Sequence, residues 1–276
     1  MEKNSIQQRH YFIELMAWWD GGINAPKLEQ QFSQSRQQSS ADINQYKELA
    51  PENLYYNASQ KINLPTNQFQ PHYISGSADD YLFWFHTKQL ITPSVGQHSE
   101  ILSVPPRKMS ADVIRNIVAA IRHNRRVEVD YVSLNAPNHE GRVIAPHSFV
   151  KAGNRWHLRA WCEKSKEFRD FVLSRFRGIP ALEENKTEHT AEKDTAWNTP
   201  VTLILQPDQR LSPEKQAVLQ SDYQMQNGQL KITTRGCLVQ YLLREMQVST
   251  KVLDGTPEAQ QLVCVNLPEI KKWLFE

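Results

Sequence analysis

The chain has 276 residues, enough for two or three domains, and its 39% hydrophobic and 22% charged residues are typical of a folded globular protein. Glu14 interrupts the apolar stretch 11–19 and no small-residue cleavage site follows, so we expect neither a signal peptide nor a membrane span. Three isolated cysteines argue against a disulfide or zinc framework and indicate a cytoplasmic protein.

The positive charge is concentrated in the middle of the chain. Residues 101–180 carry 15 Lys and Arg against 7 Asp and Glu, a net charge of +8. The flanking segments 1–100 and 181–276 each have a net charge of −3. This asymmetry predicts an anionic partner for the middle segment.

Residues 1–91 are predicted to form a winged helix-turn-helix domain. A first helix over 7–19 has one apolar face and ends at the Gly21-Gly22 pair. Asn24 is expected to cap a short second helix, and Ser35 a third that runs to about Leu49. Two short apolar runs around a turn at 57–60 predict the hairpin wing, and a packing helix is expected over 77–89.

The polar start of the third helix has the side chains that read DNA in the second helix of such a motif. The candidate DNA contacts are Ser35, Arg36, Gln37, Gln38, Ser39 and Ser40, with Lys47 at the far end of the helix and Lys61 in the wing. Alternatively, this polar helix end is only a solvent-exposed face with no partner. The net charge of −3 over residues 1–100 is an objection to DNA binding, because nucleic-acid-binding surfaces are usually basic. A dimer answers it, because two helices one DNA turn apart need few phosphate contacts each.

The stretch 92–109, with a proline pair, is the expected linker into a second domain over 110–180. That domain begins with a helix over 110–123. The runs 155–161 and 169–176 then alternate with the period of a strand, and arginines occupy several of the polar positions. Arginines on neighbouring strands favour a phosphate-bearing ligand, because the guanidinium group binds oxyanions with two donors.

Several motifs in this domain resemble the WYL domain. They are Trp156-His157-Leu158 at the name-giving motif, the strand 127–131, Arg142 to Pro146, and Arg169-x-Phe171-x-Leu173-x-Arg175. The resemblance implies an SH3- or Sm-like β-barrel with a basic pocket for a nucleotide or a short nucleic acid. The candidate ligand-binding residues are Tyr131, Ser133, Arg142, His147, His157, Arg159, Arg169 and Arg175. Of these, Tyr131, Arg142, His157, Arg169 and Arg175 match the ligand-facing pattern of the family, while some arginines are alternatively expected to form ion pairs that only hold the barrel.

Residues 181–200 are polar and predict a second linker, followed by a C-terminal domain over 201–276. A strand at 201–205, a helix at 212–220, a hairpin of Tyr223–Gln226 and Leu230–Thr233, and a helix over 237–246 resemble a ferredoxin-like βαββα unit. The same order is similar to the extension that follows many WYL domains, so we assign dimerisation to it. The predicted fold class is therefore α+β.

The segment 32–71 also resembles the winged-helix domain of WYL repressors of the BrxR and CapW type, which control bacterial phage-defence islands. The resemblance implies a homodimeric repressor of a defence operon that binds a palindromic double-stranded operator and responds to a nucleotide or nucleic-acid effector. We expect no enzyme activity, metal or cofactor, since no nucleophile elbow, phosphate loop or zinc motif occurs. Regulation of a partner helicase or nuclease, and transcriptional activation, remain alternatives.

Overall fold

The computed structural model describes residues 6–91, 104–105, 107–134, 137–138, 140–250 and 256–275. It contains two compact units. The first comprises residues up to 149 together with 156–187, and the second comprises 150–155 and 188–276. The expected linker 92–109 lies mostly outside the described residues. No helix of the described part is long and apolar enough to cross a membrane.

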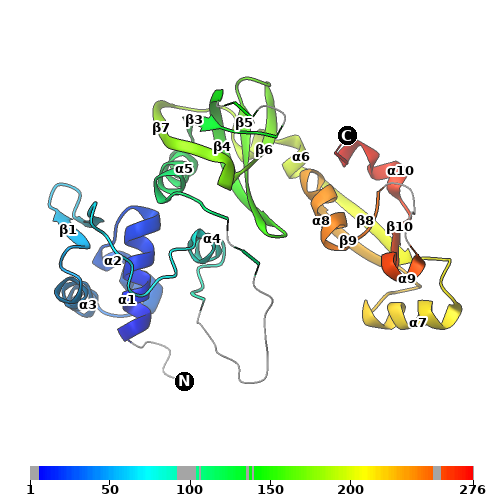
Figure 1. The fold of residues 1–276 in the computed structure, drawn as a ribbon, viewed down its shortest axis with the longest axis horizontal. Helices are drawn as coiled ribbons and strands as arrows, with labels where there is room; N and C mark the ends of the chain where they lie inside the picture. Colours follow the sequence, from blue (N-terminus) through cyan, green and yellow to red (C-terminus); the bar gives the residue numbers. More distant parts are fainter. Residues whose placement is uncertain are drawn as a thin grey trace. The chain divides into compact units, whose positions relative to one another are not determined.

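The first helices of unit 1 form the expected helix-turn-helix (Figure 1). Helix α1 (Ile6–Leu15) continues into a short π-helix (Met16–Asp20), which ends at Gly21 with a left-handed φ of 86°. Helix α2 (Ala25–Phe32) begins where the Asn24 side chain accepts the Lys27 N–H, and α3 (Arg36–Leu49) begins where Ser35 accepts the Gln38 N–H. Both predicted caps are confirmed.

The wing is confirmed as well. Strand β1 (Leu54–Asn57) pairs with β2 (Ile62–Pro65) in an antiparallel hairpin that aligns Leu54 with Pro65 and Asn57 with Ile62. Two backbone hydrogen bonds of 2.9 and 2.8 Å between Ile23 and Asn63 tie the hairpin to the segment before α2. The wing is therefore fixed to the helix-turn-helix at its base. Helix α4 (Ala78–Thr87) packs on the same core.

A buried carboxylate organises this domain. Glu14 is fully buried, and its oxygens accept the backbone N–H groups of His72, Tyr73 and Ile74 and the hydroxyl of Tyr46. Tyr46 belongs to α3, so Glu14 anchors both α3 and the segment that leads to α4. The interruption of the apolar pattern at Glu14 is thus a structural hydrogen-bonding site inside the core.

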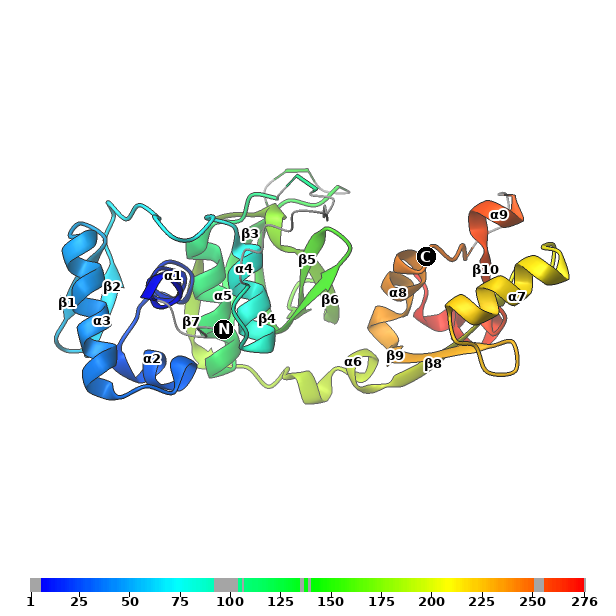
Figure 2. The same cartoon turned by 90° about the horizontal axis from the view of Figure 1, so that it is seen from below.

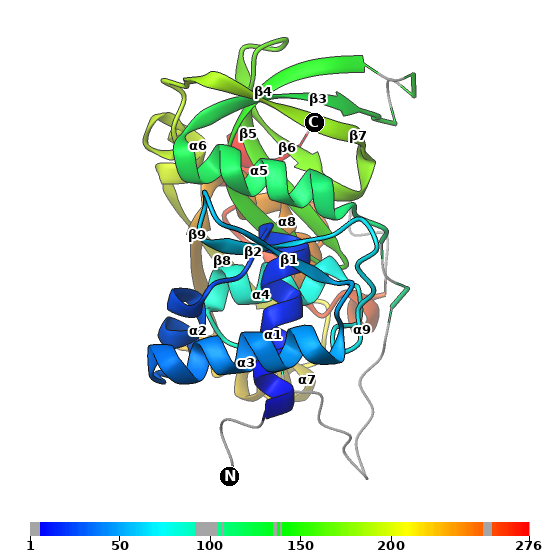
Figure 3. The ribbon, with the colours of Figure 1, turned by 90° about the vertical axis from the view of Figure 1, so that its left-hand side faces the viewer.

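The rest of unit 1 is a helix on a five-stranded antiparallel sheet of order β6-β5-β4-β3-β7. Its elements are α5 (Ala111–His123), β3 (Arg125–Tyr131), β4 (Glu140–Ala152), β5 (Arg155–Cys162), β6 (Glu167–Val172) and β7 (Phe176–Lys186). Helix α5 packs against β3 and β7 and lies between the sheet and the winged-helix elements (Figure 3). Strand β7 continues to Lys186, inside the segment predicted as a linker.

The expected closed SH3- or Sm-like barrel is not confirmed. In the described part of the chain the sheet is open, with β6 and β7 at its edges. Two register shifts between β3 and β7 bend the sheet, since an irregular pairing increases local twist. Strand β7 follows β6 after a single short 3-10 turn (Leu173–Arg175), yet it pairs with β3 and not with β6.

Unit 2 contains a three-stranded sheet of order β10-β8-β9 (Figure 2). Its main elements are α6 (Thr195–Asn198), β8 (Pro200–Pro207), α7 (Pro213–Asp222), β9 (Leu230–Arg235), α8 (Val239–Glu245), α9 (Pro257–Gln260), β10 (Leu262–Cys264) and α10 (Leu267–Ile270). The ferredoxin-like arrangement is not confirmed. Residues 223–226 do not form a strand, although Gln226 makes an isolated bridge to Gln229 across the turn at 227–228. Strand β9 pairs along its whole length with β8, and β10 covers the other edge of β8.

Candidate nucleic-acid interface

One face of α3 is polar and solvent-exposed along its whole length. Arg36, Ser40, Asn44 and Lys47 are spaced by four, four and three residues, which places them on one side of a helix. Arg36, Ser40 and Asn44 are exposed and Lys47 is half-buried. Ile43 and Tyr46, which lie beside this row on the helix, are packed into the core. The helix is therefore held firmly while this face stays open to a partner.

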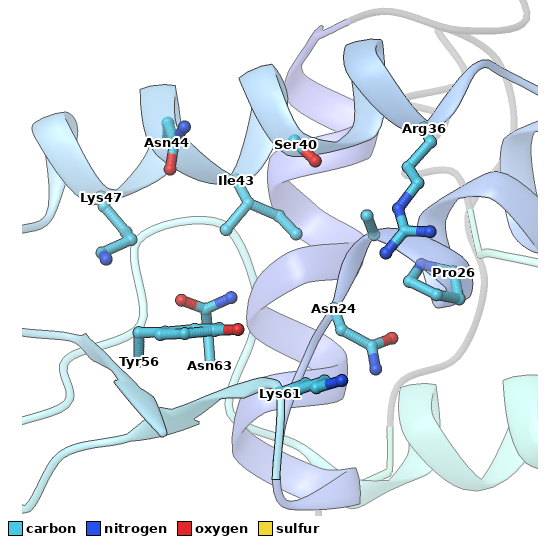
Figure 4. Close-up of a pocket in the computed structure, with 11 residues that line it drawn as sticks. Asn24, Pro26, Arg36, Ser40, Ile43, Asn44, Lys47, Tyr56, Lys61 and Asn63 are labelled. Carbon is cyan, nitrogen blue, oxygen red and sulfur yellow. The ribbon is translucent and has the colours of Figure 1, made fainter. Parts of the chain in front are cut away.

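The wing completes a pocket beside this face. The pocket has a volume of about 400 Å³, and Figure 4 shows Tyr56 and Lys61 of the wing lying across from Arg36 and Lys47 of α3. Tyr56 is 54% exposed, and Lys61 takes a left-handed φ of 53° at the turn before β2. Asn24, at the cap of α2, lines the same pocket.

The other predicted residues at the start of α3 have different surroundings. Ser35 is used as the helix cap. The Gln38 side chain is exposed, but its amide donates to Asp42 at 2.9 Å. Ser39 is fully buried and donates to the Ser35 carbonyl at 3.0 Å, so its side chain does not lie on the exposed face. Gln37 is exposed.

Part of the negative charge of the first hundred residues lies inside the domain and not on this face. Glu14, Asp20 and Asp42 are buried, and each is bonded to donors inside the domain. The residues that line the pocket include three cations and no Asp or Glu. Buried, paired carboxylates contribute little to the potential outside, so the local surface between α3 and the wing is basic.

Sequence reasoning missed three residues of this face, namely Asn24, Asn44 and Tyr56. Asn44 follows Ser40 at the helical spacing of four, and that spacing was enough to find it. Asn24 was recognised only as a cap. Tyr56 lies in a predicted strand with Tyr55, and nothing in the period of two distinguishes an exposed tyrosine from a buried one.

In the five-stranded sheet, Tyr131 and Arg142 lie together. Tyr131 is buried, packs edge-on against Phe171 and Phe176, and its hydroxyl accepts the Val172 N–H at 3.0 Å. The guanidinium of the half-buried Arg142 lies 5.9 Å from the centre of the Tyr131 ring. Tyr131 is thus part of the core, and only Arg142 of this pair reaches the surface.

Arg159 and Arg169 point to opposite faces of the sheet. Arg159 is buried and pairs across the strands with Asp170, with 3.2 Å between the guanidinium and the carboxylate. Arg169 is adjacent to Asp170 on β6, so its side chain leaves the other face. It is 52% exposed and contacts Glu167 at 2.6 Å. The structure therefore does not bring these two arginines together.

The remaining predicted ligand residues are spread over the sheet. His157 is buried opposite Val172, and His147 is half-buried, with Nδ1 2.9 Å from the Ser148 hydroxyl. Ser133 follows β3 and Arg175 lies in the turn between β6 and β7, both half-buried.

Several contacts join the winged-helix elements to α5 and the sheet. Asp20 accepts two hydrogen bonds from Arg122, and Arg115 donates to the Trp18 carbonyl at 2.8 Å. The indole N–H of Trp156 donates to Asp79 at 2.8 Å, and Phe85 meets Phe149 edge-on. The core is also continuous from α1 to β6. The winged-helix elements, α5 and the sheet therefore share one packed core.

Sequence models of three protein domains match this chain in order. The BrxR transcriptional regulator winged helix-turn-helix domain matches residues 5–87, the WYL domain 112–180, and the BrxR C-terminal dimerization domain 200–270. DNA-binding transcriptional repressors named CapW are similar along almost the whole chain. The protein from Escherichia coli (strain KTE188) is 36% identical over 96% of this chain and 90% of its own, and that from Pseudomonas aeruginosa is 34% identical over the same shares. The chain belongs to the CapW family.

The CapW protein of Stenotrophomonas maltophilia, at 32% identity over 98% of this chain and 92% of its own, agrees with this membership. Among solved structures, the proteasome accessory factor B/C of Arthrobacter aurescens is 15% identical and covers 97% of this chain and 48% of its own. Its TM-score of 0.29 is too low to support a common arrangement. The resemblance to WYL repressors of the BrxR and CapW type is thus confirmed over all three domains.

Proposed function

We propose that this CapW-family protein is a cytoplasmic, homodimeric repressor that binds a palindromic double-stranded DNA operator and releases it in response to an effector. We assign no enzyme activity to it. The controlled genes are a phage-defence operon, and the effector is a nucleotide or a nucleic-acid fragment bound by the WYL-like domain. The observation that carries the proposal is the basic, acid-free face formed by α3 and the wing.

The chemistry of this face suits a DNA duplex. Arg36 is the side chain suited to guanine, and Asn44 has the paired donor and acceptor that match adenine. Lys47 and Lys61 are suited to backbone phosphates, and Tyr56 to sugar or phosphate oxygens. Helix α3 is capped by Ser35 and anchored by Tyr46 in the core, so a rigid element presents these side chains.

The proposed dimer and the proposed effector are supported by separate observations. The C-terminal segment 200–270 matches a dimerization domain, and a twofold dimer reads two half-sites related by the same symmetry. The net charge of +8 over 101–180 favours an anionic effector, and Arg142, Arg169 and Arg175 are its candidate partners. Repression is relieved only if the effector binds the DNA-free arrangement more tightly than the DNA-bound one.

A gel shift on the DNA upstream of the gene of this protein tests the proposal. We expect a specific complex with two chains per site that scrambled DNA does not displace. Arg36→Ala should lose about 1–3 kcal/mol of specific affinity. The matched control is Lys215→Ala, which removes an exposed cation from α7 and should bind as the wild type does. Equal affinity of wild type and Arg36→Ala for specific and scrambled DNA would contradict the proposal.

The proposal of an effector is tested by titrating the Arg169→Ala/Arg175→Ala double variant with nucleotides and short oligonucleotides. Loss of affinity relative to wild type is expected, because two guanidinium donors are removed. Unchanged affinity for every phosphorylated ligand would refute effector binding at these arginines while leaving DNA binding intact.

A further inference from the structure

A second pocket, of about 410 Å³, lies in unit 1 where α2, α4 and α5 meet. It shares no lining residue with the pocket between α3 and the wing. Lys27 comes from α2, Lys88 from the end of α4, and Arg122 from the last turn of α5. The pocket therefore touches both the winged-helix domain and the WYL-like domain. Its volume is in the range of small-molecule sites.

The pocket has more cations than anions. The three cations face one carboxylate, that of Asp20. Asp20 accepts from Lys27 at 2.7 Å and from Arg122 at 2.7 and 3.2 Å, and the Tyr81 hydroxyl donates to it as well. One carboxylate leaves a formal excess of two positive charges. Such an excess in a concave site attracts an anion of complementary charge.

Lys88 is the cation that Asp20 does not neutralise. Its ammonium donates to the Phe85 carbonyl at 2.9 Å and lies 4.3 Å from the centre of the Trp84 ring. Among the described residues, no carboxylate lies within ion-pair distance of it. Burial first, and then the nearby Arg122 charge, lower the pKa of Lys88 against the opposing charge of Asp20, and a bound anion offsets both effects.

The backbone fixes Lys88 in a conformation that lysine disfavours. It is the C-terminal cap of α4, with a left-handed φ of 59° that helix ends commonly give to glycine. Its N–H donates to the Trp84 carbonyl, and its own carbonyl accepts from Gln31 of α2 at 3.3 Å. The helix end therefore fixes the backbone of Lys88, and its side chain lines the pocket.

We propose that this pocket binds the phosphate group of a small ligand, either inorganic phosphate or a phosphate monoester. Lys88 and Arg122 supply the charged donors, since an ammonium and a guanidinium together match the oxygens of a phosphate dianion. Lys27, on the same pocket wall, lies at the start of α2. A bound phosphate therefore links the helix-turn-helix to α5 at a site separate from the arginines of the sheet.

The test uses the full-length protein, isothermal titration calorimetry and constant ionic strength. The probes are inorganic phosphate, adenosine 5′-monophosphate and adenosine. The key variant is Lys88→Gly, which removes the ammonium and suits the left-handed backbone, so the fold is retained. The matched control is Lys166→Gly, because Lys166 is also a left-handed lysine but is exposed in the turn before β6 and lines neither pocket.

We expect wild type and Lys166→Gly to bind phosphate equally, and Lys88→Gly to bind it at least about tenfold more weakly, the loss of one charged hydrogen bond. Tighter binding of the monophosphate than of phosphate assigns the site to a monoester, and equal binding assigns it to free phosphate. Adenosine should not bind. Equal phosphate affinity of wild type and Lys88→Gly, with matching melting curves, would overturn the proposal, whatever the outcome of the DNA experiments.

Discussion

The buried carboxylate of Asp20 joins the winged-helix domain to α5, and Asp20→Asn tests what this contact contributes to stability. The Asp20 side chain is 1% exposed, whereas those of Lys27 and Arg122 are 31% and 41% exposed. Removing one partner of a fully buried ion pair costs about 3–5 kcal/mol, because the other charge stays desolvated. Since solvent reaches both cations, we discount this to about 2–3 kcal/mol for the variant.

The assay is chemical denaturation of wild type and Asp20→Asn, followed by tryptophan fluorescence. Asp222→Asn is the matched control, because Asp222 is exposed at the end of α7, and it should change the unfolding free energy by less than about 0.5 kcal/mol. A loss of less than about 0.5 kcal/mol in Asp20→Asn as well would refute the reasoning.

The same residue predicts a dependence on pH. Burial alone would raise the pKa of Asp20, but the Lys27 charge and the hydrogen bonds from Arg122, Lys27 and Tyr81 outweigh it and hold the pKa below its ordinary value. A lowered pKa stabilises the fold above the unfolded-state value of about 3.9, and this stabilisation is lost as the pH falls through the folded-state pKa. The gap between wild type and Asp20→Asn should therefore be constant from neutral pH to about pH 5 and shrink below about pH 4.

Three further outcomes are expected from groups inside unit 1. Tyr46→Phe removes a buried hydroxyl bonded to Glu14 and Asn53 and should cost about 1–3 kcal/mol in urea unfolding; a smaller loss than about 0.5 kcal/mol would show that Glu14 does not depend on it. Burial lowers the pKa of His10, against the pull of Asp42, so wild-type stability should decline as the pH falls below about 6.5, and His10→Gln should flatten that slope in melts between pH 5 and 7. Trp156→Phe removes the indole N–H that donates to Asp79 and should lower the free energy of unfolding by about 1 kcal/mol. Melting curves identical to those of wild type would argue that this hydrogen bond does not stabilise the fold.

Local chemistry made much of the winged-helix domain predictable. Asn24 and Ser35 are residue types whose side chains accept an N–H at a helix start, and both do so here. The apolar faces of the first and third helices are set by the helical period, and the wing follows from two short apolar runs around a polar turn. These features depend on neighbours within a few positions, which a sequence displays directly.

Other features depend on residues far apart in the chain. The hydrogen bonds of Asp20 come from as far as Arg122, and no local pattern relates the two. Arg159 and Arg169 share a strand pair, yet the register sends them to opposite faces, and a register shift of one residue would reverse this. Strand β10 has three residues, too few for a period of two to be recognised.

The central claim, that α3 and the wing bind DNA through three cations per chain, is tested most directly by the salt dependence of operator affinity, measured by fluorescence anisotropy. Lys47 and Lys61 are the expected phosphate contacts, and on two chains they predict a slope of log K against log salt of about −4, since each phosphate contact contributes about −0.9. Lys61→Gly should make the slope shallower by about 2, and Lys88→Gly should leave it unchanged. Identical slopes for wild type and Lys61→Gly, with the same affinity, would contradict the account.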